Sequence, residues 1–156
     1  WKYGEEKRAK KIAKAIVEAR KSSHINSTQD LAELILEIIP RRFNDKKHPA
    51  TKTFQAIRIF INNELEELEA LLIFISKQLK IGGRACIISF HSLEDRMVKR
   101  FFRDHSRRDP KLSKLPNLPD ESSFKIVSKA LKPEESEVIA NPRSRSATLR
   151  VIEKIK

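Results

Sequence analysis

The chain has 156 residues and a mass of 18.1 kDa, a length typical of a single domain. Its hydrophobic content of 39% can build a core and excludes wholesale disorder. The 33 Lys and Arg residues outnumber the 21 Asp and Glu residues, so the formal net charge is +12 and the pI is about 10.0. This charge favours a polyanionic partner, most simply nucleic acid.

Cysteine content and hydropathy indicate the compartment. A single Cys excludes a disulfide framework and a Cys-based zinc site, and it suits a reducing cytosol. The longest purely apolar run, residues 70–75, is too short to cross a bilayer, and the first residues lack the apolar segment of a signal peptide. His24 and His105 have no second ligand nearby in the sequence. We therefore expect a cytoplasmic protein with no membrane partner and no metal.

The basic residues are clustered rather than evenly spread. Residues 22–40 hold three acids and no Lys or Arg. The excess of Lys and Arg lies in four blocks, residues 1–21, 41–58, 96–114 and 141–156. Such blocks favour a basic surface patch over a merely soluble surface.

The first eighty residues show the spacing of amphipathic helices. The second helix has Ser27 or Thr28 as its N-cap and ends before Pro40, and Asn63 can cap the fourth. Residues 82–83 are both Gly and supply the positive φ that a helix C-cap favours. The periodicity predicts four helices, at residues 5–21, 29–39, 50–62 and 64–80.

After residue 83 the apolar residues no longer have helical spacing. Residues 84–90 form a short apolar run typical of a strand buried on both faces. Ser92 and Asp95 are spaced as a capping box for a helix over residues 93–104. A helix, a Gly-Gly turn, a buried strand and a capped helix are typical of a doubly wound α/β sheet.

The last fifty residues are predicted to add little to this sheet. Residues 105–121 are rich in Pro, Ser and charge and indicate a loop. A half-exposed strand is predicted at 124–129 and a short helix at 134–140. The final strand, 146–155, lies either at a sheet edge or beside 124–129 as its hairpin partner.

Four stretches together resemble the bacterial ribosomal RNA small-subunit methyltransferase H family (RsmH, also called MraW). The longest and most specific is Ser-Phe-His-Ser-Leu-Glu-Asp-Arg at 89–96, which follows Gly82-Gly83-Arg84. The other three are Tyr3-Gly4-Glu5-Glu6 with the helix after it, His48-Pro49-Ala50-Thr51-Lys52-Thr53-Phe54, and Asn141-Pro142-Arg143-Ser144-Arg145-Ser146-Ala147.

The resemblance implies an enzyme that uses S-adenosylmethionine to methylate N4 of a cytosine in small-subunit (16S) ribosomal RNA. It implies an α/β fold, a class I (Rossmann-like) methyltransferase domain interrupted by a helical domain. Residues 1–62 then correspond to the helical substrate-recognition subdomain, and residues 63–156 to the C-terminal portion of the methyltransferase domain. The implied partner is the small-subunit ribosomal RNA or the assembling ribosomal subunit.

The family's N-terminal half has no counterpart in these 156 residues. That half carries a Gly-rich cofactor loop, whereas this chain has Gly only at positions 4, 82 and 83. We therefore expect a C-terminal fragment that is inactive alone, with the main cofactor-binding residues outside it. The sheet should then be incomplete. We expect the chain either to self-associate through the open edge or surface of the 84–90 strand, or to cover it with its own helices in an arrangement unlike that of the family.

The candidate catalytic residues are His91, Ser92 and Asp95, beside Glu94. They follow the carboxyl end of the 84–90 strand, where doubly wound sheets place ligands. By the resemblance they line the substrate cytosine pocket, where an acceptor must hold the amine and take its proton. The alternative is that Ser92 and Asp95 only cap the following helix.

Basic residues on two predicted helices and one turn are candidates for RNA contacts. Each phosphate contact would add affinity and salt dependence. The alternative is a set of solvated faces. A non-enzymatic basic RNA-binding module is the second function that the composition supports. The candidate RNA-binding residues are Lys52, Arg58, Arg96, Lys99, Arg100, Arg103, Arg143 and Arg145.

Overall fold

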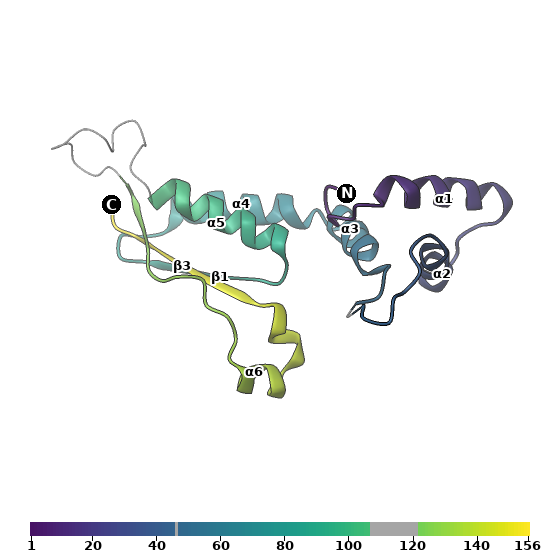
Figure 1. Ribbon diagram of the computed structural model, residues 1–156. Coiled ribbons are helices and arrows are strands. Elements are labelled where there is room, and N and C mark those ends of the chain that lie inside the picture. The colour runs from purple at the N-terminus through teal and green to yellow at the C-terminus, as the bar shows by residue number, and fades with distance from the viewer. Residues whose placement is uncertain (46, 107–121) are drawn as a thin grey trace, which may run out of the picture. The chain divides into compact units, whose positions relative to one another are not determined.

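A computed structural model describes residues 1–45, 47–106 and 122–156. The chain divides into two compact units, Trp1–Glu64 and Leu65–Lys156, which we describe separately (Figure 1). The described residues hold six α-helices, one 3₁₀ helix and three strands, a mixed α/β content. None of these helices is both long and apolar enough to span a membrane.

The first unit is helical, as predicted. Its helices are α1 (Ala9–Ser22), α2 (Thr28–Ile38) and α3 (Thr51–Ile61). Ile12, Ile35 and Ala50 form its buried core, and partly buried apolar residues of all three helices pack around them. The helical spacing of these residues is therefore explained by one shared core.

The start of α2 confirms the predicted N-cap at Ser27. The amide of Asp30 donates to Ser27 Oγ at 3.1 Å, and the amide of Ser27 donates to Asp30 Oδ2 at 3.0 Å. This reciprocal capping box satisfies two amides that have no partner within the helix.

Helix α4 (Glu64–Gln78) leads into the second unit, and α5 (Ser92–Ser106) follows the first strand. Asn63 has a φ of 51° immediately before α4, and Gly82 has a φ of 78° shortly after it. The predicted break at Asn62–Asn63 and the positive φ at Gly82 are thus confirmed. The prediction of a loop over 105–121 is wrong at its first two residues, which belong to α5. Residues 107–121 lie outside the described part.

The sheet has three strands, β1 (Arg84–Ser89), β2 (Phe124–Ile126) and β3 (Thr148–Lys154), in the order β1-β3-β2. β3 is antiparallel to both neighbours, with Cys86 opposite Val151 and Ile126 opposite Ile152. The pairing of β3 with β2 confirms one of the two alternatives, whereas an edge position for β3 is wrong because β1 occupies its other side. Helix α6 (Glu135–Ala140) and the 3₁₀ helix η1 (Pro142–Ser146) connect β2 to β3.

The core of the second unit lies on one face of this sheet. Helices α4 and α5 lie along this face (Figure 1). Ala85, Ile87 and Ile152 form one buried cluster with apolar side chains of the two helices, including Leu72 and Phe102. These interdigitated groups remove a continuous apolar surface from water.

The other face of β1 is exposed. Burial alternates along the strand, and Ile88 retains 57% of its exposure. Phe90, just beyond the strand, retains 54%. The prediction of a strand buried on both faces is therefore wrong within the described residues, because their helices α4 and α5 cover only the face that carries Ala85 and Ile87.

We predict that this chain self-associates through β1 and its exposed face. Among the described residues β1 pairs only with β3, so its far edge leaves backbone N–H and C=O groups open beside Ile88 and Phe90. Sedimentation velocity should show concentration-dependent association, and Ile88→Lys should shift the distribution toward monomer. Val17→Lys, at an exposed apolar position of the first unit, is the matched control. A strictly monomeric wild-type chain would contradict the prediction.

Candidate functional site

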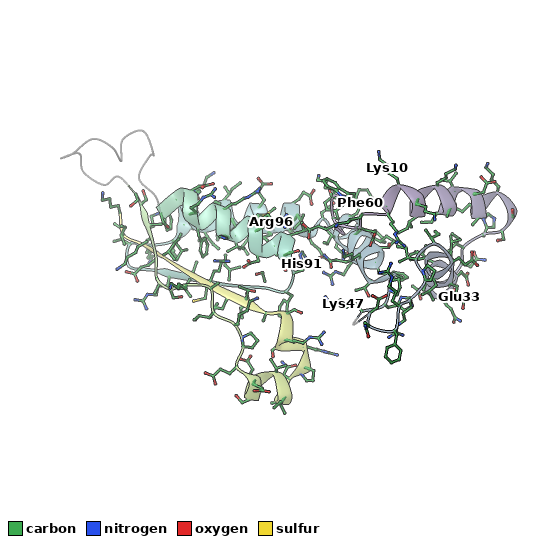
Figure 2. All side chains as sticks on the ribbon, in the orientation of Figure 1. Lys10, Glu33, Lys47, Phe60, His91 and Arg96 are labelled. Atoms are coloured by element: carbon green, nitrogen blue, oxygen red, sulfur yellow. The ribbon has the colours of Figure 1, made fainter. Side chains whose placement is uncertain are left out.

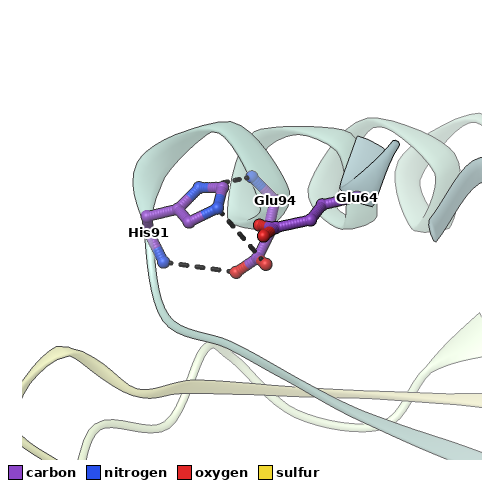
Figure 3. A group of neighbouring side chains, drawn as sticks. All are labelled: Glu64, His91 and Glu94. Atoms are coloured by element: carbon purple, nitrogen blue, oxygen red, sulfur yellow. Dashed lines mark hydrogen bonds and ion pairs between the residues drawn. The ribbon is translucent and has the colours of Figure 1, made fainter. Parts of the chain in front are cut away.

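The turn from β1 into α5 is held by His91 and Glu94 (Figure 3). Glu94 Oε2 accepts hydrogen bonds from the amides of Phe90 at 2.8 Å and His91 at 3.3 Å. In return, the Glu94 amide donates to His91 Nδ1 at 3.4 Å. This arrangement is a reciprocal cap one residue before the predicted Ser92–Asp95 pair, with Glu94 reaching back to the N-cap residue.

The His91 ring is held almost out of solvent. Its side chain is 11% exposed, and Nε2 lies 3.3 Å from Glu94 Oε1. No described residue forms a hydrogen bond of good geometry with this buried Nε2. The ring is therefore fixed by its Nδ1 contact, and Nε2 of the neutral ring carries the hydrogen and lies beside Glu94 Oε1 at the carboxyl end of β1.

Asp95 is engaged with β3. Its carboxylate forms two hydrogen bonds with Arg150, Nε to Oδ1 at 2.8 Å and Nη2 to Oδ2 at 3.0 Å. Ser89 Oγ lies 3.5 Å from the same Oδ1 and also donates to the Thr148 carbonyl at 3.3 Å. A two-pronged contact between carboxylate and guanidinium fixes both groups. Asp95 thus ties the first turn of α5 to the centre of the sheet.

Arg150 also sets the charge state of Asp95. Its hydrogen bonds, aided by its charge and that of Lys132, hold the pKa of Asp95 below the usual value of 3.8, against an opposing effect of burial. The carboxylate is consequently ionised at neutral pH. The catalytic role expected of Asp95 stays a prediction, and the structure adds a structural role that the sequence did not indicate.

The predicted basic residues of α5 lie on one exposed face of that helix. Arg96, Lys99, Arg100 and Arg103 are spaced by three or four residues and are all exposed, and Arg96 lies at the same end of α5 as His91 (Figure 2). Arg103 pairs with Asp104 at 2.8 Å, and this contact raises the pKa of the guanidinium further. The face as a whole can meet several phosphates.

The aromatic residues of α5 are core residues. Phe102 is buried, and Phe101 packs against the same cluster while its ring stacks on His105 at a centroid distance of 3.9 Å. They therefore continue the apolar stripe of α5 rather than form a base-stacking platform. His105 lies within α5 and not in a loop as predicted.

The remaining predicted basic residues belong to other elements. Lys52 and Arg58 are on α3 in the first unit, where Arg58 forms hydrogen bonds of 2.7 and 2.9 Å with Glu64. Arg143 and Arg145 lie on η1 with exposed side chains. η1 leads directly into β3, so the predicted turn before the last strand is confirmed.

The capping role of Glu94 and the contribution of Arg150 were not predicted from the sequence. Glu94 stands three residues after His91, which is capping-box spacing, but His is an uncommon N-cap and the signal from Ser92 competed with it. Arg150 lies 55 residues from Asp95. A contact of that separation depends on strand register, which no local pattern of one sequence reveals.

We predict that Asp95→Asn destabilises the second unit by about 1–3 kcal/mol at neutral pH, the range for hydrogen bonds to charged groups. Because folding lowers the pKa of Asp95, its contribution to stability is full above the ordinary pKa of 3.8 and is lost as the pH falls through the lowered pKa. Urea unfolding followed by circular dichroism should therefore show a difference at pH 7 that shrinks in acid.

Asp104→Asn is the matched control on the same helix, since Asp104 is exposed and pairs only at the surface with Arg103. It should leave the unfolding curve nearly unchanged. Equal unfolding free energies of the wild type and Asp95→Asn at pH 7 would show that the contact with Arg150 contributes nothing.

Comparison with known proteins identifies the family of this chain. The model of the MraW methylase family matches residues 1–155. The ribosomal RNA small subunit methyltransferase H of Coxiella burnetii is 49% identical over 99% of this chain and 50% of its own length. Proteins of the same name from Nitrosococcus oceani and Xanthomonas oryzae pv. oryzae are 48% and 47% identical, over 97% and 99% of this chain.

The chain spans about half the length of these curated relatives. The family match nevertheless runs through both units and includes the β1–α5 turn with His91 and Glu94. The chain belongs to the MraW methylase family.

Proposed function

We propose that this chain is the C-terminal part of an enzyme that methylates cytosine N4 in small-subunit ribosomal RNA with S-adenosylmethionine as methyl donor. The observation that carries the proposal is the family match over residues 1–155. In this proposal the first unit recognises substrate, and the second is the C-terminal part of a class I methyltransferase sheet. The substrate is cytoplasmic ribosomal RNA, free or in the assembling subunit.

The described residues do not fit the methyl donor itself. Gly82 and Gly83 lie in the turn before β1, at the end of the strand opposite to the one where open α/β sheets bind ligands. The carboxyl end of β1 is followed by Phe90 and His91, with no glycine whose backbone could approach a nucleotide closely. We therefore assign no cofactor-binding residue in this chain and derive no step through the cofactor.

The residues of the β1–α5 turn support substrate positioning. An exocyclic amine must be held so that its nitrogen lone pair points at the group it attacks, so a rigid hydrogen-bonding partner matters more than a strong base. The turn holds such groups rigidly, because the amides of Phe90 and His91 fix the Glu94 carboxylate, which is an acceptor. His91 Nδ1 accepts from the Glu94 amide, so Nε2 of the neutral ring is a donor beside that carboxylate. Ser92 and Asp95 stand beside it on α5, and Asp95 is anchored by Arg150.

A non-enzymatic basic RNA-binding module is the second candidate. The absence of a nucleotide-binding cradle from the described residues favours it for this chain considered alone. The exposed basic face of α5 supports RNA binding under either function.

Methyl transfer by the complete gene product tests the enzyme against the module. The product should place labelled methyl groups on unmodified small ribosomal subunits, and nucleoside mass spectrometry should identify N4-methylcytidine. The 156-residue chain alone should transfer none. RNA binding without any methyl transfer by the complete product would favour the module.

We predict that His91→Gln in the complete product lowers the rate of methyl transfer about 10- to 100-fold, the loss expected when a reacting group is misplaced. His24→Gln, in the first unit, is the matched control and should keep the wild-type rate. Circular dichroism separates a folding defect from a lost contact, and unchanged activity of a folded His91→Gln would remove His91 from the site.

RNA binding by this chain should be chiefly electrostatic. With several Lys and Arg residues exposed, the logarithm of the affinity for single-stranded RNA should fall by about 0.7 per phosphate contact for each unit of log salt concentration. Fluorescence anisotropy between 50 and about 200 mM salt measures this slope. An affinity that does not change with salt would contradict the prediction.

A further inference from the structure

A pocket of about 520 Å³ opens between α5 and the chain after β2. α5 contributes Lys99, Phe102 and Arg103, β3 contributes Arg150, and residues 126–130 form the opposite wall. The pocket lies entirely within the second unit, and its volume is within the range of about 300–1,000 Å³ typical of small-molecule sites. None of the predictions from the sequence identified it.

The charge of the pocket is entirely positive. Lys99, Arg103, Lys129 and Arg150 line it, and no Asp or Glu is among its lining residues. Arg150 is neutralised by Asp95, and Arg103 shares its charge with Asp104. Lys99 and Lys129 are exposed, and in the described ranges no acidic side chain is paired with either. These two lysines therefore supply the available positive charge.

The rest of the pocket is apolar with one unsatisfied hydroxyl. Phe102, Ile126 and Val127 line it, and Ile126 and Val127 are 44% and 38% exposed. Ser128 Oγ is buried and finds no hydrogen-bond partner within the described part of the chain. A buried hydroxyl without a partner is costly unless a ligand or water satisfies it.

We propose that this pocket holds one nucleotide of the single-stranded part of the RNA substrate. Lys99 and Lys129 bind the phosphate, and the apolar wall at 126–127 receives the sugar or base. A site with cations at the rim and an apolar floor matches a nucleotide better than a bare anion, which would leave the floor exposed to water. The proposal rests on the proposed RNA substrate and adds a contact separate from the β1–α5 turn.

The test compares two double variants of equal charge. Lys99→Gln with Lys129→Gln removes the pocket lysines, and Lys77→Gln with Lys80→Gln removes two exposed lysines near the end of α4. The probe is a fluorescein-labelled single-stranded RNA, measured by anisotropy over a salt series. The pocket variant should bind about 10-fold more weakly at low salt and lose about 1.4 from its salt slope, which corresponds to two single-strand phosphate contacts. The control variant should show less than about half of this loss of affinity and less than about half of this loss of salt slope.

Crosslinking locates the contact independently of affinity. RNA containing 4-thiouridine should crosslink to peptides that include residues 126–130 in the wild type, and these crosslinks should disappear in the pocket variant. Equal losses in both double variants would show a general effect of net charge and would overturn the pocket. Unlabelled competitors identify the occupant. If cytidine monophosphate abolishes the crosslinks to residues 126–130 but the unlabelled RNA oligonucleotide does not, the occupant is a free nucleotide and the proposal is overturned.

The outcomes separate this inference from the proposed function. If the wild-type chain binds RNA with a steep salt slope and the pocket variant does the same, the pocket proposal fails while the RNA substrate stands. If the wild-type chain binds no RNA at any salt concentration, the RNA-binding part of the proposed function fails as well.

Discussion

The pairing of β1 with β3 is the contact on which the second unit depends. It joins Arg84 to Glu153 and Ser89 to Thr148, positions 69 and 59 residues apart, and β2 can join the sheet only once β3 is in place. The same register brings Arg150 under α5, where it meets Asp95. The sheet and the position of α5 on it therefore depend on this one long-range pairing. Forming the β1–β3 pair closes a long loop of chain, which costs more conformational entropy than forming any local contact.

Local features were largely predictable from the sequence, and long-range ones were not. The helices, the Ser27 cap and the positive φ at Gly82 follow from spacing and residue type within a few positions. The N-cap of α5 is His91 rather than the predicted Ser92. The pairs His91–Glu94 and Ser92–Asp95 both have capping-box spacing, so the sequence alone does not show which pair caps the helix. The central position of β3 required knowledge of strand order, which no local pattern contains.

The error about β1 has a physical origin. Residues 85–88 are all apolar or nearly so, and a uniformly apolar strand suits burial on either face or on both. Which faces are buried depends on what covers them. In the described residues α4 and α5 supply one layer of cover, which leaves Ile88 exposed while Ile87 is buried. The residues of β1 are therefore apolar enough to be buried on both faces, but the described residues of this chain cover only the face that carries Ile87.

Arg150 connects the turn that carries His91 with the pocket beside α5. Its guanidinium is fixed by both oxygens of Asp95, and the same side chain forms part of the pocket wall. A cation held in this way gives shape to the wall but little net charge, because the carboxylate beside it cancels its field at short range. The attraction for an anion is then left to Lys99 and Lys129, whose long side chains can adjust to a phosphate without disturbing the sheet. The ion pair thus fixes α5 on the sheet, and in the proposed site the two exposed lysines supply the charge for the phosphate.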